Sequence, residues 1–199
     1  WQLPPGRVKP GRIEHAFGWP LDPATYGGSF LYHLDNDRIY IGYVVGLNYQ
    51  DPRFKPFEAF QQFKHHPRIK PMLEGGEILA AGARTIVTGG YQSLPRLDMP
   101  GAMLIGDAGG TLNVFKIKGI HQAIRSGALA AEHLAEQGKT AGFDTRWRNS
   151  AGHRELHSVR NFKPAFKRGL YFAMANAGVE SLLKGKTPSL IRDGAYRRF

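Results

Sequence analysis

An acidic residue, Asp107, stands in a glycine-rich loop directly after a short apolar run of this sequence. The run, residues 102–105, predicts a buried strand, and the loop, residues 106–110, predicts a turn. A helix is predicted to begin near Gly119, a short way along the chain. A carboxylate at the end of a strand, with a helix N-terminus close by, is an arrangement that suits polar and negatively charged ligands. The alternative is that Asp107 only caps a helix, while the glycines only turn the chain.

The helix after this loop is indicated by apolar residues at helical spacing, which are Ile117, Ile120, Ile124, Ala128 and Ala131. Gly138 provides the signal for its end, because glycine readily adopts the left-handed conformation that closes many helices. Elsewhere in the chain, we expect a strand over residues 77–83 and two further helices over residues 147–161 and 170–183.

A β-hairpin is predicted upstream of the loop, over residues 29–34 and 38–47, with its turn at residues 35–37. One face of its second strand would carry Ile39, Ile41, Tyr43 and Val45. Gly42 and Gly46 lie on the other face, where the missing side chains would let a ligand or another backbone approach closely.

A short helix is predicted to begin at Pro56 and to end at His65 and His66. One side of this helix carries Phe57, Phe60 and Phe63. Two adjacent residues on a helix point about 100° apart, so the histidine pair is a poor metal site. A helix C-terminus that favours cationic histidine is the better explanation, and no metal ligand is assigned.

The composition is that of a folded protein, since 42% of the 199 residues are hydrophobic and 12% are aromatic. The sequence contains no cysteine, which excludes disulfides, thiolate-bound zinc and cysteine-ligated iron–sulfur clusters within these residues. No apolar run reaches the length of a membrane-spanning helix. The chain begins at Trp1 rather than at methionine, so we expect it to be a piece of a longer protein.

The net charge of +11 is concentrated in residues 146–199, which hold twelve Lys or Arg and only three Asp or Glu. Such a basic segment predicts contact with phosphate groups of lipids or nucleic acid, and the alternative is a solvated basic face. Within it, residues 170–183 form an apolar run flanked by cations, which favours a helix at a membrane surface. The stripe that would meet the membrane is Tyr171, Met174, Ala175, Gly178 and Leu182. The alternative for this helix is ordinary packing on the core.

The loop with Asp107 and the helix after it resemble the second flavin fingerprint of FAD-dependent oxidoreductases of the glutathione-reductase type. The resemblance implies that Gly106, Asp107 and Ala108 lie at the ribityl chain of FAD and that the carboxylate holds a ribityl hydroxyl. It also implies that the backbone amides around Gly119 and Ile120 face O2 and N1 of the isoalloxazine. A reduced flavin gathers negative charge at this edge, which suits a helix N-terminus. No side chain is assigned a catalytic role, since FAD would carry the redox chemistry.

Several longer stretches resemble the electron transfer flavoprotein–ubiquinone oxidoreductase family, and the resemblance runs from about residue 1 to about residue 186. These stretches are residues 19–22, 25–33, 44–50, 63–67, 73–76, 113–121 and 158–161. That family passes electrons from a soluble flavoprotein, through an iron–sulfur cluster and FAD, to ubiquinone in the membrane. The resemblance implies that the quinone headgroup meets the backbone of Tyr26, Gly27 and Gly28, where glycine exposes amide and carbonyl groups. The alternative is that these residues only form the entry turn of the hairpin.

The chain departs from the family pattern at a few positions. Ile120 stands where the family usually has a hydroxyl residue in its K-G-T-H motif, so a side-chain hydrogen bond to the flavin is lost. Phe115 replaces a common proline, and Gly106-Asp107 is nearer to the wider flavoenzyme pattern than to the Gly-Cys typical of the family. The departure at Ile120 alters the redox tuning that the resemblance implies.

The expected fold class is α+β: a fragment of a glutathione-reductase-type FAD-binding fold with an inserted antiparallel-sheet quinone-binding domain. We expect a β-rich quinone-binding region over residues 1–95, the second half of the FAD-binding domain over residues 96–140, and a basic helical tail over residues 141–199. The sequence has no G-x-G-x-x-G fingerprint, so the N-terminal half of the FAD-binding domain is missing, and so is the cluster domain with its cysteines. FAD needs the missing half, and the 4Fe-4S cluster of the family has no ligands here. The fragment alone is therefore expected to be inactive.

The expected function is that of an oxidoreductase of the electron-transfer-flavoprotein dehydrogenase type. Its partners would be electron transfer flavoprotein, ubiquinone and an anionic membrane surface, without nucleic acid. The protein would be peripheral, on the cytoplasmic face of a bacterial inner membrane or the matrix face of the mitochondrial inner membrane. A related FixC-like or geranylgeranyl-reductase-like flavoprotein is the alternative enzyme, and a basic nucleic-acid-binding module is the alternative from another class. The turn at Tyr26, Gly27 and Gly28 favours the first interpretation.

Overall fold

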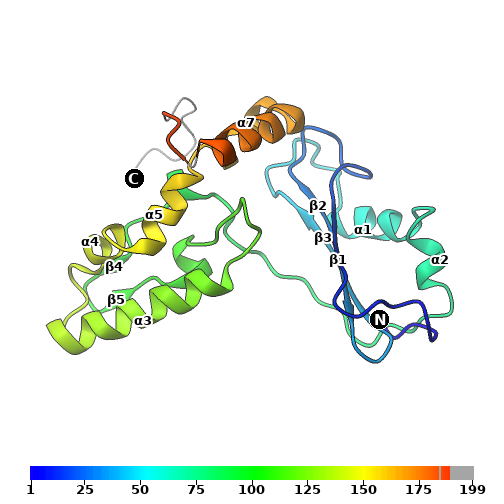
Figure 1. The fold of residues 1–199 in the computed structure, drawn as a ribbon, viewed down its shortest axis with the longest axis horizontal. Helices are drawn as coiled ribbons and strands as arrows, with labels where there is room; N and C mark the ends of the chain where they lie inside the picture. Colours follow the sequence, from blue (N-terminus) through cyan, green and yellow to red (C-terminus); the bar gives the residue numbers. More distant parts are fainter. Residues whose placement is uncertain (184, 189–199) are drawn as a thin grey trace. The chain divides into compact units, whose positions relative to one another are not determined.

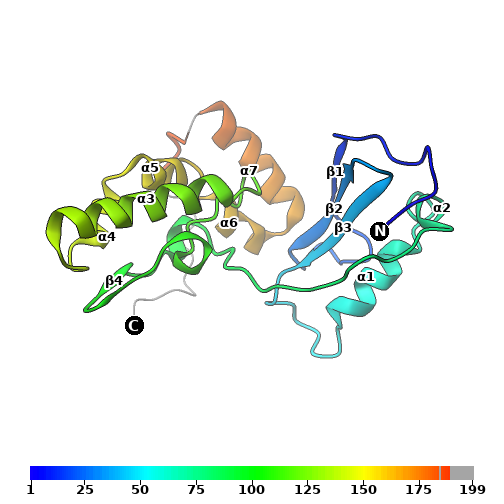
Figure 2. The ribbon, with the colours of Figure 1, turned by 90° about the horizontal axis from the view of Figure 1, so that it is seen from below.

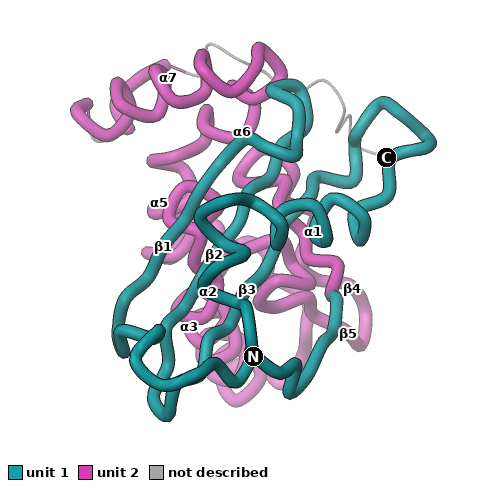
Figure 3. Tube along the Cα trace, turned by 90° about the vertical axis from the view of Figure 1, so that its right-hand side faces the viewer, with its two compact units in different colours: residues 1–83 teal, residues 84–199 magenta. Residues whose placement is uncertain are grey.

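The computed structural model describes residues 1–183 and 185–188, and the chain forms two compact units, residues 1–83 and residues 84–199 (Figure 3). Each unit has a hydrophobic cluster of its own. The three-part division expected from the family resemblance, with boundaries after residues 95 and 140, stays a prediction.

The first unit is built on a three-stranded antiparallel sheet (Figure 1). Its strands, in order across the sheet, are β1 (Ile13–Ala16), β2 (Gly27–Leu34) and β3 (Arg38–Val45). β2 and β3 form the predicted hairpin, which is confirmed. In its turn, Asn36 and Asp37 have φ angles of 58° and 51°, in the left-handed region that these two residue types tolerate best after glycine.

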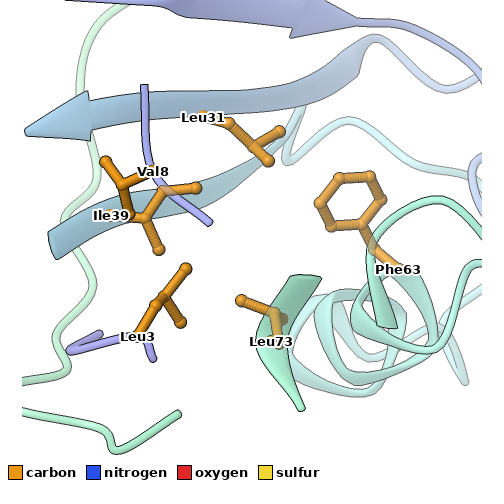
Figure 4. Close-up of a cluster of buried hydrophobic side chains, with 6 residues drawn as sticks. All are labelled: Leu3, Val8, Leu31, Ile39, Phe63 and Leu73. Carbon is orange, nitrogen blue, oxygen red and sulfur yellow. The ribbon is translucent and has the colours of Figure 1, made fainter. Parts of the chain in front are cut away.

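The core of this unit lies between the sheet and two helices, α1 (Pro56–Lys64) and α2 (Lys70–Leu73). Its buried side chains are Leu3, Val8, Leu31, Ile39, Phe63 and Leu73 (Figure 4). Ile41 and Tyr43 pack against this cluster from β3, so the face of that strand predicted to carry Ile39, Ile41 and Tyr43 lies against the core.

Helix α1 begins and ends where the sequence predicts, but only part of its aromatic side is covered. Phe63 is buried, whereas Phe57 is exposed. Just beyond the helix, His66 packs on Trp19 with ring centroids 5.4 Å apart, and its Nδ1 accepts the N–H of Arg68 at 3.2 Å. These contacts give this histidine a structural role at the end of the helix.

The opposite face of β3 lacks a side chain at Gly42, and an aromatic ring fills the space. The ring of Phe30 lies directly over Gly42, so that a Cβ there would overlap the ring. Phe30 also packs against Tyr40, with ring centroids 5.7 Å apart. Gly46 approaches another backbone instead, because its N–H donates to the carbonyl of Tyr26 at 2.6 Å. Close backbone approach therefore accounts for one of the two glycines and aromatic packing for the other.

The second unit is mainly helical, and its hydrophobic cluster is formed by Leu97, Ala130, Phe143, Trp147 and Leu156. Its helices are α3 (Ile120–Gln137), α4 (Phe143–Arg148), α5 (Ala151–Ser158), α6 (Phe162–Ala165) and α7 (Leu170–Leu182) (Figure 2). The strands β4 (Asp98–Met99) and β5 (Ala102–Met103) pair antiparallel, and 3₁₀ turns lie at Tyr91–Ser93, Gly106–Gly109 and Phe166–Arg168. Helices combined with small antiparallel sheets confirm the α+β class.

One predicted strand is shorter than expected, and another is wrong. Of residues 102–105, only the two residues of β5 pair with another strand, and Ile105 is exposed rather than buried. Of residues 77–83, only Glu77 is bridged, to Gln2. A strand needs a neighbour for its backbone hydrogen bonds. Beyond these pairings, the first run makes one more such bond, from the N–H of Leu104 to the carbonyl of Leu97 at 2.8 Å, and then leaves its neighbour.

The single helix predicted over residues 147–161 is also wrong, because the structure divides it into α4 and α5. The break lies at Ser150, whose hydroxyl accepts a hydrogen bond from the N–H of His153 and caps the start of α5. Serine favours such a cap because its side chain competes for backbone hydrogen bonds.

Helix α3 has the predicted bounds, and Gly138 closes it in the left-handed conformation with a φ of 63°. The apolar residues that indicate this helix are nevertheless turned outward, since Ile120 is 80% exposed and Ile124 is exposed as well. Its buried side carries Gln122, Ser126, Ala130 and His133. Helical spacing alone therefore predicted the helix but not the side that the unit covers.

Helix α7 confirms the helix predicted over residues 170–183, and its apolar stripe faces outward. Tyr171 is 79% exposed and Leu182 is 84% exposed, whereas Ala173 and Glu180 face the inside of the unit. Within its own unit, α7 therefore does not pack its apolar stripe on the core, which was the alternative to a membrane contact.

The C-terminal end of α7 is held in place by a network of buried polar residues. The guanidinium of Arg160 donates to the carbonyls of Gly185, at 2.9 Å, and of Thr187. The amide of Asn161 donates to Thr187 Oγ1 at 3.3 Å, and that hydroxyl donates in turn to Glu180 Oε1 at 3.2 Å. Residues that follow the helix are thereby tied back to the segment between α5 and α6.

We expect Gly152→Ala to destabilise the protein, although glycine is normally the weaker helix former by about 1 kcal/mol. A Cβ at Gly152 would lie 2.5 Å from Trp147 Cη2 and 2.7 Å from Gln122 Oε1, and both side chains are fully buried. Overpacking of this kind costs about 1–3 kcal/mol. Urea unfolding measures the free energy of unfolding of the two proteins.

Gly127→Ala is the matched control, because Gly127 lies in α3 and its nearest atom, Ile105 Cδ1, would be 3.9 Å from the new Cβ. This variant is expected to be more stable than the wild type by about 0.5–1 kcal/mol. A gain of similar size in both variants would show that the Trp147 ring moves aside and that the packing argument is wrong.

Candidate functional site

Asp107 and the N-terminus of α3 lie side by side in the second unit. Asp107 is in the 3₁₀ turn Gly106–Gly109, and its carboxylate lies against Gly119, the N-cap residue of α3. A Cβ at Gly119 would stand 2.7 Å from Asp107 Oδ1, so a glycine is what lets the carboxylate come this close. The structure thus brings together the acid and the helix terminus that the sequence placed in one site.

The capping alternative does not account for Asp107. No side chain caps the N-terminus of α3 by a hydrogen bond, and Asp107 Oδ1 is buried without a hydrogen-bond partner among the described residues. The first amide groups of any helix lack partners within the helix. A buried acceptor without a donor is uncommon and unfavourable. The site therefore combines one buried acceptor, Asp107 Oδ1, with the first backbone N–H groups of α3, which are donors.

The turn that carries Asp107 is fastened to α3 through Gly106. The N–H of Gly106 donates to Ser126 Oγ at 2.8 Å, and its carbonyl accepts the hydroxyl of Thr111 at 3.0 Å. A Cβ at Gly106 would come within 3.3 Å of Ala123 Cβ, so close packing on α3 accounts for this glycine. Ala108, the neighbour on the other side, is exposed. The contacts of Gly106 are therefore the main ones that hold the turn, and with it Asp107, against α3.

A tight loop joins this turn to α3 and contains a strained residue. The N–H of Asn113 donates to the carbonyl of Lys118 at 3.0 Å, and the N–H of Lys118 donates back to Asn113 at 3.2 Å. Between them, Ile117 has a φ of 54°, which is unusual for a β-branched residue. Backbone strain of this kind is found most often at functional sites. The sequence carries no signal for it, since isoleucine is not a turn residue.

One carboxylate, that of Glu155 in α5, organises this loop and the first turns of α3. Its Oε1 accepts from Asn113 Nδ2 at 2.9 Å and from Lys116 Nζ at 3.0 Å, and lies 2.9 Å from His121 Nε2. Its Oε2 accepts from Arg125 Nη1 at 2.9 Å. Burial works to raise the pKa of Glu155, but the hydrogen bonds from His121, Lys116 and Asn113 prevail and lower it to about 2. Sequence reasoning assigned Glu155 no role, because its partners come from distant parts of the chain.

The turn at Tyr26, Gly27 and Gly28 lies at the start of β2 in the first unit. A Cβ at Gly27 would lie 2.5 Å from Leu21 Cδ1, and one at Gly28 would overlap the carbonyl oxygen of Ala16. Burial raises the pKa of the Tyr26 hydroxyl, which is therefore protonated at neutral pH. Packing within the chain requires both glycines, and the structure places them in β2 rather than in the predicted entry turn. The contact of Tyr26, Gly27 and Gly28 with a quinone stays a prediction.

Comparison with known proteins gives a consistent result. A family model described as "ETF-QO, ubiquinone-binding" matches residues 1–86. A protein of Arabidopsis thaliana named "Electron transfer flavoprotein-ubiquinone oxidoreductase, mitochondrial" is 46% identical over 98% of this chain. Proteins of the same name from Rattus norvegicus and Sus scrofa are 45% and 47% identical over 94% and 90% of the chain. The resemblance to this family is confirmed over nearly the whole chain.

The chain spans about a third of the length of the curated relatives that it matches, with shares of 31%, 33% and 32% for the three named above. The part that matches the ubiquinone-binding model of the electron transfer flavoprotein–ubiquinone oxidoreductase family ends close to the boundary of the first unit at residue 83. The chain contains no cysteine, so it holds no thiolate ligand for an iron–sulfur cluster. Among residues 1–183 and 185–188, no helix is both long and apolar enough to cross a membrane.

We expect Glu155→Gln to lower the free energy of unfolding by about 2–3 kcal/mol at pH 7. The pKa of Glu155 falls from 4.5 to about 2 on folding. Its carboxylate therefore stabilises the folded protein fully above about pH 4.5, and this stabilisation is lost as the pH falls towards 2. The difference between the wild type and the variant in chemical unfolding should accordingly shrink between pH 5 and pH 3.

Glu132→Gln serves as the control, since Glu132 is exposed and lies 3.3 Å from Arg146 in a surface ion pair. Its effect is expected to stay below about 1 kcal/mol. A pH-independent loss in Glu155→Gln would mean that the variant acts through packing rather than through the charge.

Proposed function

We propose that this chain is the part of an electron transfer flavoprotein–ubiquinone oxidoreductase that meets the flavin end of FAD and the quinone at a membrane surface. The whole protein would pass electrons from electron transfer flavoprotein to ubiquinone. The resemblance to this family supports this proposal. The observation that carries it is the buried, unpartnered Oδ1 of Asp107 next to the uncapped N-terminus of α3.

The residues at this site fit FAD. Among the described residues, Asp107 Oδ1 is an acceptor without a donor, and a ribityl hydroxyl would supply one. The N-terminus of α3 favours negative charge, as at the pyrimidine edge of a reduced flavin. Ile120 offers no hydrogen-bonding side chain, so only backbone groups of the first turn would meet that edge. FAD, when bound, supplies the redox chemistry, while the chain binds and orients it.

Other parts of the longer family architecture would complete the enzyme. The chain has no G-x-G-x-x-G fingerprint for the ADP half of FAD and no cysteine for a cluster. We therefore propose that the chain by itself holds FAD weakly and is inactive. The quinone part of the proposal rests on the match over residues 1–86, because Asp107 and α3 would serve a FixC-like or geranylgeranyl-reductase-like flavoprotein equally well.

Helix α7 is proposed to lie in the membrane interface. Its exposed stripe includes Tyr171, Met174 and Leu182, and its buried side is anchored through Glu180. The cations around it are Lys163, Lys167 and Arg168 before the helix and Lys186 after it, while Lys184 lies outside the described residues. Cations near anionic headgroups contribute about 1 kcal/mol each. A peripheral position of this kind would let a lipophilic quinone reach the protein from the bilayer, on the cytoplasmic or matrix face.

Asp107→Ala, made in the full-length protein that contains this segment, is expected to weaken FAD binding about tenfold to a hundredfold. A hydrogen bond to a charged group contributes about 1.5–3 kcal/mol, which corresponds to that change in affinity. Asp107→Asn keeps an acceptor oxygen and should retain more of the affinity. Equilibrium titration of the apoprotein with FAD measures the effect, and an unchanged affinity in Asp107→Ala would remove Asp107 from the flavin site.

Replacing Tyr171 and Leu182 together by glutamine is expected to reduce binding to liposomes that contain anionic lipid. Both side chains are exposed, so the fold should tolerate the change. Loss of a buried apolar side chain weakens membrane partition by about 1.5–3 kcal/mol at full burial. Flotation of the protein with liposomes measures binding, which should also fall as salt is raised.

Ile124→Gln provides the matched control, because Ile124 is an exposed apolar residue on another helix of the same unit. Its liposome binding should equal that of the wild type. The membrane role of α7 is wrong if the wild-type protein stays in the soluble fraction at low salt.

A further inference from the structure

Helix α5 packs against α3 in the second unit (Figure 2). From α5, the carboxylate of Glu155 reaches the loop before α3 and the first two turns of that helix. The proposed flavin site uses the same end of α3. The charges gathered around Glu155 therefore adjoin the place where the pyrimidine edge of FAD is proposed to lie.

One negative charge faces two positive charges in this cluster. Lys116 Nζ and Arg125 Nη1 lie 3.0 Å and 2.9 Å from the carboxylate oxygens of Glu155, and both side chain types are cationic at neutral pH. Burial works to raise the pKa of Glu155, but the hydrogen bonds from His121, Lys116 and Asn113 lower it to about 2, so the carboxylate is ionised at neutral pH. Loss of its charge would leave the two cations without their shared anion.

Two further charges of opposite sign lie near this cluster. Lys118 is exposed in the same loop, and the carboxylate of Asp107 lies against Gly119. Together with Lys116 and Arg125, these groups leave one excess positive charge around the N-terminus of α3 while Glu155 is ionised, and two without it. The charge of Glu155 thus sets how positive this end of the helix is.

The carboxylate of Glu155 is also less exposed than its two cationic partners. Its side chain is 18% exposed, compared with 50% for Lys116 and 52% for Arg125. Water and salt screen an exposed charge more than a covered one. We therefore expect Glu155 to act on a negative charge nearby more strongly than either cation does alone.

We propose that Glu155 is a positioning residue that keeps the reduction potential of bound FAD low. This inference rests on the proposed flavin site at Asp107 and α3. Reduced flavin gathers negative charge at its pyrimidine edge, and the helix N-terminus and the cations Lys116 and Arg125 stabilise such charge. The carboxylate of Glu155 opposes this stabilisation, because it repels negative charge itself and pairs with both cations.

The experiment measures the midpoint potential of FAD in the full-length protein that contains this segment. Spectroelectrochemical titration of the flavin absorbance, at pH 7 and fixed salt, gives this potential, with the electrode as the source of electrons. Glu155→Gln removes the negative charge and keeps the size of the side chain, so it is expected to shift the potential in the positive direction. Lys116→Gln and Arg125→Gln each remove a positive charge and should shift it in the negative direction, by less.

A double variant of Glu155→Gln and Lys116→Gln separates charge from structure. It has lost one charge of each sign, so its potential should return towards that of the wild type. Its free energy of unfolding should stay below that of the wild type, because the contacts of Asn113 and His121 with the carboxylate remain lost. If Glu155→Gln does not fold, the single variants of Lys116 and Arg125 still test the sign of the effect, since both side chains are half exposed.

Glu132→Gln is the matched control for the loss of a carboxylate. Glu132 is 60% exposed and lies eleven residues beyond His121 on α3, about 16 Å further along the helix. This distance exceeds the Debye length of about 8 Å at physiological salt. The potential of this variant should equal that of the wild type.

An unchanged or more negative potential in Glu155→Gln overturns the proposal, and so does a shift of the same sign in Glu155→Gln and in the two cation variants. The affinity of Asp107→Ala for FAD tests the flavin site separately. Weakened affinity in Asp107→Ala together with unmoved potentials would refute only the role of Glu155. Unchanged affinity in Asp107→Ala would refute the flavin site itself, and this inference with it.

Discussion

The carboxylate of Glu155 is the contact on which the candidate flavin site depends most. It gathers donors from the loop before α3 and from the first turns of α3, and it is itself supplied by α5. Without it, the four groups of Asn113, Lys116, His121 and Arg125 would lose their shared partner in a partly buried position, which is unfavourable. The contacts of Glu155 position the N-terminus of α3. Asp107 is held separately, by the hydrogen bond between Gly106 and Ser126.

Glycine has two different physical roles in this chain. At Gly119 and Gly106, the missing side chain lets a carboxylate and a tight turn come against α3. At Gly27 and Gly42, the same property serves packing of the chain on itself, against Leu21 and the ring of Phe30. Gly119 and Gly106 adjoin Asp107, whose Oδ1 is buried without a hydrogen-bond partner among the described residues, and a ligand argument is strongest where packing leaves such an atom behind.

The exposed apolar faces of the second unit have a common feature. Helix α3 covers polar residues such as Ser126 and exposes Ile120, and α7 covers Glu180 while it exposes Tyr171. In each helix an inward polar side chain has a hydrogen-bond partner, Ser126 in α3 and Glu180 Oε1 in α7, whereas Gln122 Oε1 and Glu180 Oε2 are buried without one among the described residues. The outward apolar side of α7 is the surface on which its proposed membrane contact rests.

Local signals in the sequence were sufficient for several elements and for part of the site. The turn residues of the hairpin, Pro56 at the start of α1 and Gly138 at the end of α3 act within a few residues, so their effect is readable without a fold. The placement of Asp107 near a helix N-terminus was also predictable, because both lie in one short stretch. The long stretches that resemble the family were enough to indicate it.

The tertiary structure alone decided which runs became strands, where the helix after Trp147 breaks, and which side of α3 is buried. Strands need a partner, and among the described residues none pairs with residues 77–83 beyond the bridge at Glu77. Glu155 meets donors that are 30 to 42 residues away in the chain, and His33 meets the backbone of Lys9 across 24 residues. Such contacts depend on the fold bringing distant residues together, and no local pattern of residue types encodes them.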